Sequence, residues 1–126
     1  IESIITREEL NRARTRVDQI YVDNKLRAYI VELVMATREP AKYGLAPIEN
    51  LVRVGGSPRA SISLIRAAKA HAFIRGRGYV TAEDVKAIAY NVLCHRLILS
   101  YEAEAEEIKS TEIVKEVLGQ IEVPAP

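Results

Sequence analysis

An uninterrupted, alanine-rich segment in the middle of the chain most constrains its fold. Ser57 is a favoured N-cap residue, and Pro58 suits the first helical position, where a missing N–H costs nothing. No other proline or glycine follows until Gly76, which can cap the C-terminus. Apolar residues cover almost every side of this segment, which is typical of the buried centre of a bundle. The pattern therefore predicts a helix over residues 58–75 around which the chain packs.

Three expected helix starts can be compared. Thr6 is followed three residues later by Glu9, and Thr81 by Asp84, so each of these starts carries a capping box or a close variant of one. Ser57 has no acid at the corresponding position. The start at Ser57 is therefore predicted to be open, with its positive end unmasked.

Arg59 lies at the second position of this open helix. A cation is disfavoured there by the helix dipole, unless an anion arrives to offset it. The preceding Gly55-Gly56 pair keeps the approach free of side chains. Such a helix end is typical of an anion-binding site. An ordinary N-cap beside a solvated arginine is the alternative.

The rest of the chain also has helical periodicity. The pattern predicts helices over 7–20, from an Asp23 cap to Pro40, from Thr81 to about Leu97, and around 113–121, with a short acidic helical piece over 102–107. Arg96 falls near the end of one of them, where a cation suits the dipole. We find no strand-like alternation. The fold class is all-α, a small bundle of about five helices in one domain, 1–126, in which residues 100–126 form an acidic C-terminal segment ending in a short helix.

Residues 39–56 are the least regular part, with turn signals and room for one short helical turn. Loops of this length are often functional. The chain has 126 residues, enough for one core without disulfides, and its single cysteine, Cys94, suits a reducing compartment such as the cytoplasm. No stretch is long enough to span a membrane. The start at Ile1, without methionine, predicts a fragment of a longer protein.

Charge is unevenly distributed along the chain. Residues 1–99 carry 16 Lys and Arg against 10 Asp and Glu, whereas residues 100–126 carry 2 against 7. A basic body suggests an anionic partner, although two opposite surfaces of one bundle would give the same numbers. One hypothesis is a nucleic-acid-binding module that uses Arg12, Arg14 and Arg16. Another is a protein-interaction bundle that binds through residues 39–56 or the acidic tail.

The sequence carries no clear catalytic signature: spacing alone leaves Ser-His-Asp or Cys-His chemistry open, but nothing around Cys94 or either histidine indicates activation. No glycine-rich loop precedes a Lys-Ser or Lys-Thr pair, and no strand ends in paired acids that could hold magnesium. Cys94, His95 and His71 lack metal-ligand spacing, so we expect no metal site. This chain alone is therefore not expected to be an enzyme. It offers Arg59, which could stabilise charge on a phosphate presented by another domain.

Three stretches resemble the C-terminal helical lid of MoxR-type AAA+ ATPases. They are Gly55-Gly56-Ser57-Pro58-Arg59-Ala60-Ser61, the stretch from Arg77 to Val85, and the stretch from His95 to Ala105. The first looks like the sensor-2 motif of that family, with Gly55-Gly56 in place of the commoner Gly-Ala. Their order and spacing carry the resemblance over nearly the whole chain.

The resemblance implies a role for these residues. A missing N-terminal AAA+ domain would carry the Walker A and Walker B residues and bind ATP with Mg²⁺. The lid would pack over the nucleotide, with Gly56, Ser57, Pro58 and Arg59 at the phosphates and Arg59 as the sensor-2 arginine. No cofactor is expected to bind the fragment tightly. Such proteins usually form homo-hexameric rings, hydrolyse ATP and act as chaperone-like machines, often with a partner that contains a von Willebrand factor A domain.

Overall fold

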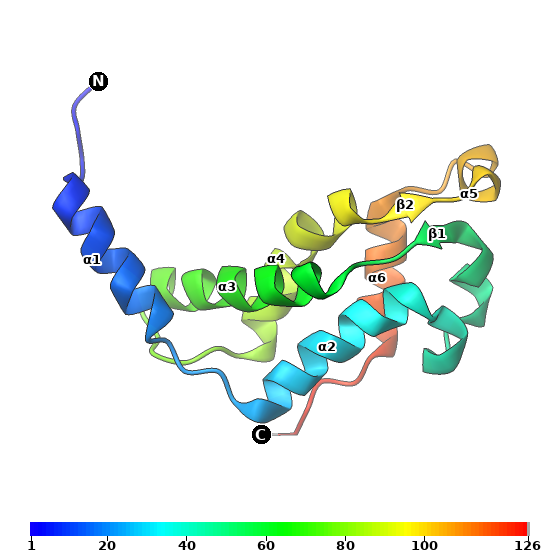
Figure 1. Cartoon of the computed structure of the whole chain (residues 1–126), viewed down its shortest axis with the longest axis horizontal. Coiled ribbons are helices and arrows are strands. Elements are labelled where there is room, and N and C mark those ends of the chain that lie inside the picture. The colour runs from blue at the N-terminus through cyan, green and yellow to red at the C-terminus, as the bar shows by residue number, and fades with distance from the viewer. Residues whose placement is uncertain (126) are drawn as a thin grey trace.

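The predicted central helix is present as α3 (Pro58–Ile74), which runs through the middle of the molecule (Figure 1). In this computed structural model, which describes residues 1–125, α3 packs against α4 (Ala82–Leu93), α2 (Asn24–Arg38) and α1 (Arg7–Asp18). α6 (Ser110–Gln120) packs against α2 and α4. The all-α prediction is thus confirmed. The last residue of the predicted domain, Pro126, lies outside the described residues.

Helix boundaries follow their local signals. α2 ends at Arg38, one residue before the Glu39-Pro40 step, as a proline requires. At the end of α3, Gly76 takes the left-handed conformation with φ of 78°, and its N–H donates to the Phe73 carbonyl at 2.9 Å. The next N–H, of Arg77, donates to the Ala72 carbonyl at 3.0 Å. This pair of bonds is a Schellman motif, so the predicted glycine cap is confirmed.

Short elements occupy the less regular stretches. They are the 3₁₀ helices η1 (Pro40–Tyr43), η2 (Ala46–Leu51) and η3 (Cys94–Arg96), the strands β1 (Val52–Val54) and β2 (Ile98–Leu99), and α5 (Tyr101–Ala105). The fourth predicted helix therefore ends earlier than expected, at Leu93, and continues as a tighter turn.

Two strands were not predicted. β1 and β2 pair antiparallel, with Val52 opposite Leu99 and Val54 opposite Ile98. Just beyond them the Ser100 hydroxyl donates to the Asn50 carbonyl at 2.7 Å. Strands of three and two residues are too short to show an alternating pattern, so only the folded chain brings them together.

α3 is central but is not buried all round, which corrects the sequence interpretation. Its buried residues, Ala60, Leu64, Ala68 and Ala72, form one stripe at four-residue spacing. On other sides Ile62 is 53% exposed. α1 contributes no buried residue at all, although its sequence is amphipathic. The core instead lies between one side of α3 and the inward faces of α2, α4 and α6, where Ile30, Leu33, Leu64, Leu93 and Ile113 are fully buried.

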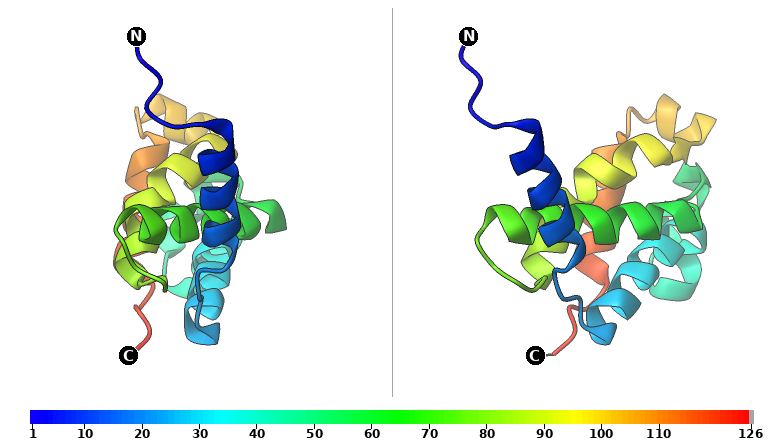
Figure 2. Two further views of the ribbon diagram at one scale, coloured as in Figure 1. Left: turned by 90° about the vertical axis from the view of Figure 1, so that its left-hand side faces the viewer. Right: turned by 60° about the vertical axis from the view of Figure 1, so that its left-hand side comes forward.

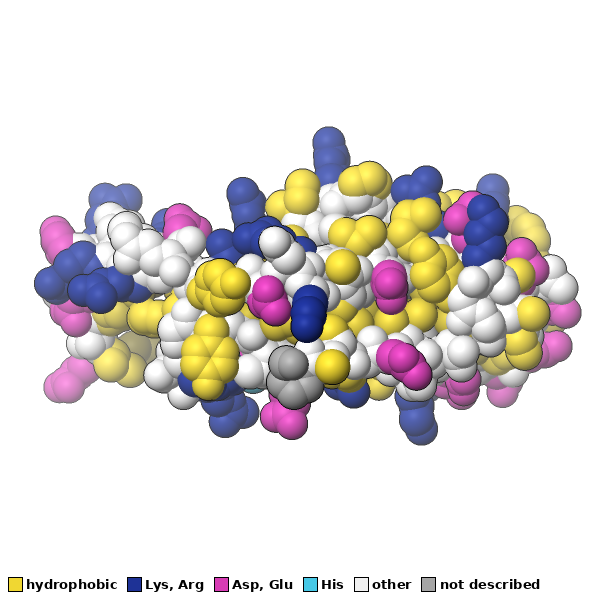
Figure 3. Space-filling view, turned by 90° about the horizontal axis from the view of Figure 1, so that it is seen from below, with side chains coloured by type: hydrophobic (Ala, Val, Ile, Leu, Met, Phe, Trp, Pro, Cys, Tyr) yellow, Lys and Arg dark blue, Asp and Glu magenta, His cyan; other side chains and the backbone are white. Residues whose placement is uncertain are grey.

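The charge asymmetry along the sequence also has a counterpart in space. Seen from below, dark blue Lys and Arg side chains are spread along the whole molecule, whereas magenta Asp and Glu side chains are more frequent toward the end opposite α1 (Figure 3). Apolar side chains show between them on the same face. No helix among residues 1–125 combines the length and apolar character that crossing a membrane requires.

Candidate functional site

The N-terminus of α3 is open, as its sequence predicts. Ser57 has extended backbone angles, φ of −88° and ψ of 172°, and its side chain forms no capping hydrogen bond. The first turn of α3 also lacks an acidic residue. At the start of α1, by contrast, the Glu9 N–H donates to Thr6 Oγ1 at 3.1 Å, and Glu9 Oε1 accepts from the Thr6 N–H at 3.3 Å. Of these two helix starts, only that of α3 leaves its positive end uncovered.

The glycine pair anchors this helix end to the C-terminal turn of α2. The Gly56 N–H donates to Thr37 Oγ1 at 2.9 Å, and that buried hydroxyl donates to the Val34 carbonyl at 2.6 Å. Gly55 lies so close to α2 that a Cβ there would overlap the Thr37 carbonyl oxygen and lie 2.6 Å from its carbon. Gly56 therefore uses its own amide to position the helix end, and the residues left facing outward are Ser57, Pro58 and Arg59.

The Gly55→Ala substitution is expected to destabilise the fold by about 1–3 kcal/mol, because the new methyl group must push the backbone of α2 away. Gly78→Ala is the matched control, since no atom lies within 4 Å of a Cβ at that glycine. Urea unfolding of the two variants measures the difference. Equal midpoints for both variants would mean that the close approach at Gly55 has no energetic weight.

The side chain of Arg59 is exposed and forms no hydrogen bond or ion pair with any residue in the described range 1–125. A second arginine, from another element, contacts α3 one turn further along. Arg96, from η3, donates from Nη2 to Ser63 Oγ at 3.1 Å, and its buried Nε has no partner among the described residues. Because Ser63 follows Arg59 by four positions, Arg96 contacts the face of α3 on which Arg59 lies. The sequence suggested only a helix-dipole role for Arg96; its contact with α3 depends on the tertiary fold.

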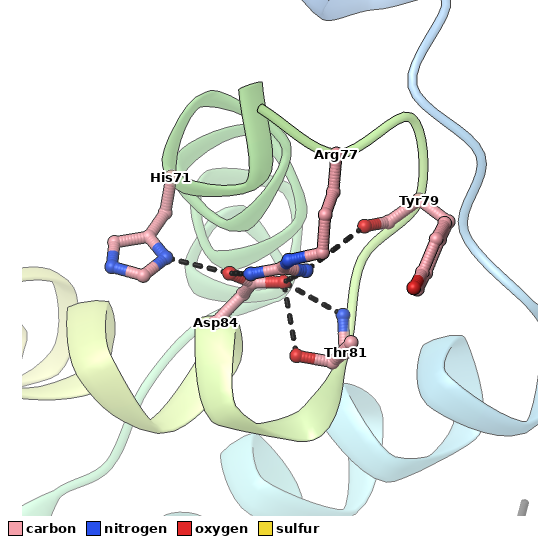
Figure 4. Close-up of polar contacts among 5 residues, drawn as sticks. All are labelled: His71, Arg77, Tyr79, Thr81 and Asp84. Carbon is pink, nitrogen blue, oxygen red and sulfur yellow. Dashed lines mark hydrogen bonds and ion pairs between the residues drawn. The ribbon is translucent and has the colours of Figure 1, made fainter. Parts of the chain in front are cut away.

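A polar network that the sequence did not reveal joins α3 to α4 (Figure 4). The carboxylate of Asp84, with 0% exposure, accepts two hydrogen bonds of 2.6 Å from Arg77 and one of 2.6 Å from His71 Nδ1. It also accepts from the Thr81 N–H at 2.7 Å, which is the predicted capping interaction. Arg77 donates to the Tyr79 carbonyl at 3.2 Å as well. The network ties the loop between α3 and α4 to both helices.

The stability of the fold is expected to depend on pH through this carboxylate. Burial alone would raise the pKa of Asp84, but the hydrogen bonds from Arg77, Thr81 and His71 outweigh burial and hold the pKa well below its ordinary value. A group whose pKa is lowered on folding stabilises the folded state above its unfolded pKa and loses that contribution on acidification. The free energy of unfolding should therefore fall as the pH drops below about 4, the range in which an unfolded aspartate titrates.

Urea unfolding at a series of pH values between neutral and about 2 measures this loss. Asp84→Asn is the reference, because the amide cannot titrate. Its unfolding free energy should vary less than that of the native chain over the same range. Parallel curves for the two proteins would contradict the assignment.

No group of three or more His, Cys, Asp or Glu side chains within residues 1–125 could hold a metal ion. Burial raises the pKa of the Cys94 thiol, which makes it a weaker nucleophile at neutral pH. The open end of α3 with Arg59 has the features that suit the binding of an anion.

Comparison with known proteins gives consistent results. The family model of the AAA lid domain matches residues 47–117. The chain is 37% identical, over 98% of its length, to Chaperone MoxR1 of Mycobacterium tuberculosis, and covers 33% of that protein. It is 39% identical, over 79% of its length, to Protein MoxR of Paracoccus denitrificans, and covers 31% of it.

A crystal structure at 2.00 Å of a candidate ATPase from Cytophaga hutchinsonii superposes on this chain with a TM-score of 0.94 and 40% identity. The match covers 98% of this chain and 38% of the other. The chain thus spans about a third of the length of the relatives that it matches.

Proposed function

This chain belongs to the AAA lid domain family and is the lid of a MoxR-type AAA+ ATPase, and we propose that it packs over ATP bound by a separate ATPase domain of the same parent protein. The observation that carries this proposal is the N-terminus of α3. It is uncapped, lacks acidic residues in its first turn and presents Arg59 with no partner among residues 1–125.

These residues fit a nucleotide phosphate. Backbone N–H groups and the dipole at a helix start favour negative charge, and a guanidinium can donate to two phosphate oxygens at once. In the proposal, Arg59 is the sensor-2 arginine that holds a phosphate, Ser57 and Pro58 line the approach, and Gly56 positions the turn through Thr37. When bound, ATP with Mg²⁺ supplies the anhydride that is hydrolysed. The carboxylates that would hold the metal are assigned to the ATPase domain.

The wider assignments rest on the same family membership. We propose that the parent hydrolyses ATP, assembles as a homo-hexamer and acts as a chaperone-like machine in the cytoplasm. A protein with a von Willebrand factor A domain is the proposed partner. The single cysteine of this chain is compatible with that reducing compartment.

The deciding experiment is an ATPase assay of the full-length parent with Arg59→Ala. The matched control is Arg75→Ala, at the opposite end of α3, where the exposed arginine follows the last helical residue. The proposal requires a large loss of turnover in the first variant and near-normal turnover in the second.

A further inference from the structure

The side of α3 that the core leaves exposed forms a groove with α1. The two helices cross in Figure 2, and the N-terminal turns of α1 extend beyond α3. The groove between them has a volume of about 970 Å³. Its apolar walls are Leu10, Ala13 and Val17 from α1, and Ile62, Ile65 and Phe73 from α3. Leu10 is 43% exposed and Ile62 53%, so two apolar walls face solvent at the same place.

The shape of this groove matches a third helix. From Leu10 to Val17 the α1 wall is about 10 Å long, and from Ile62 to Phe73 the α3 wall is about 16 Å long, at ~1.5 Å per residue. A helix of two to three turns would fill that length. An amphipathic helix normally buries its apolar stripe, and α1 buries no residue in the present structure. The apolar side of α1 contacts α3, but among residues 1–125 that contact leaves it only partly covered.

The rim of the groove indicates the charge of its occupant. Four cationic side chains line it, Arg14, Arg27, Arg66 and Lys69, against one carboxylate, Asp18. Within residues 1–125 none of the four cations forms an ion pair; Lys69 donates only to the Asp18 carbonyl oxygen, at 3.3 Å. The rim thus carries an uncompensated positive charge beside an apolar floor.

We propose that this groove binds an amphipathic helix of a partner protein, with apolar residues packed between α1 and α3 and Asp or Glu residues beside the basic rim. Helix-in-groove binding of this kind gains affinity from apolar burial and specificity from charge. Nucleic acid fits less well, because a phosphate backbone would leave the apolar floor uncovered. The groove is separate from the open start of α3, so the inference does not depend on the role of Arg59.

The probe is a fluorescein-labelled helical peptide of about 18 residues, with leucines at i, i+3, i+4 and i+7 and glutamates beside them. A second peptide has lysines in place of the glutamates. Fluorescence anisotropy should show that the glutamate peptide binds the chain at least about tenfold more tightly than the lysine peptide. Arg66→Glu with Lys69→Glu should abolish or reverse this preference, and Ile62→Ser should weaken the binding of both peptides.

The control is the double variant Arg53→Glu with Lys115→Glu, which makes the same change in net charge at exposed positions outside the groove. It should bind the glutamate peptide like the native chain. Equal affinity for both peptides, or binding unaffected by the groove variants, would overturn the proposal. The proposal would also be overturned if duplex DNA competed with the peptide and if its binding were unchanged by Ile62→Ser. Peptide binding to this chain but not to the full-length parent would also overturn the proposal, because it would mean that the parent's own ATPase domain occupies the groove.

Discussion

Replacing Arg59 with alanine in the full-length parent is expected to lower ATP turnover by about 10³-fold, the lower end of what an arginine at the transferred phosphate contributes. The physical reason is that no other charged side chain lies in the first turn of α3. The helix dipole alone stabilises a nearby anion by only ~0.3–1 kcal/mol at an exposed site. Losing the guanidinium should therefore remove most of the stabilisation that this domain offers to phosphate charge.

The lid itself should remain folded. The Arg59 side chain is exposed and forms no hydrogen bond or ion pair with the described residues, so its removal breaks no contact of that kind. Circular dichroism of the variant should match that of the native protein, and Arg75→Ala should retain turnover. Near-normal turnover by Arg59→Ala would refute the sensor-2 assignment. It would leave the family membership intact, because that rests on the sequence and fold comparisons.

Asp84→Asn is expected to be the most damaging single change to the fold, lowering the free energy of unfolding by about 3 kcal/mol. The carboxylate is fully buried and accepts hydrogen bonds from Arg77, His71 and Thr81. A neutral amide loses the charge-assisted bonds and places an N–H₂ donor among donors. Since small domains are stable by only ~5–15 kcal/mol, a loss of this size should lower the midpoint of thermal unfolding by about 10 °C.

Glu83→Gln, the neighbouring exposed acid, is the control and should change stability by less than about 0.5 kcal/mol. A double-mutant cycle with Arg77→Ala isolates the contribution of the ion pair. If the effects of Asp84→Asn and Arg77→Ala add independently, the two groups are not coupled and the ion pair between them has no role in stability. Calorimetry or urea unfolding of the four proteins provides the measurement.

The sequence predicted the features that depend on residues a few positions apart. The capping box at Thr6 and the hydrogen bond from the Thr81 N–H to Asp84 join groups three residues apart, so the local order of side chains decides them. The Gly76 cap and the absence of a cap at Ser57 are equally local. For the same reason the sequence alone predicted the open helix start at Arg59.

Only the tertiary structure decided the interactions between distant segments. β1 and β2 pair across more than forty residues, and Arg96 meets Ser63 from a different element. The amphipathic pattern of α1 predicted burial, but among the described residues its contact with α3 buries no α1 residue fully, and the groove beside α3 is the result.

Asp84 forms both kinds of hydrogen bond, one that the sequence predicted and others that only the tertiary structure decided. Its capping bond could be predicted from the spacing to Thr81, whereas its bonds to His71 and Arg77 form only after the loop folds back between α3 and α4. A sequence specifies a local hydrogen bond directly because its partners are held together by the chain. It specifies a distant one only through the packing of the whole core.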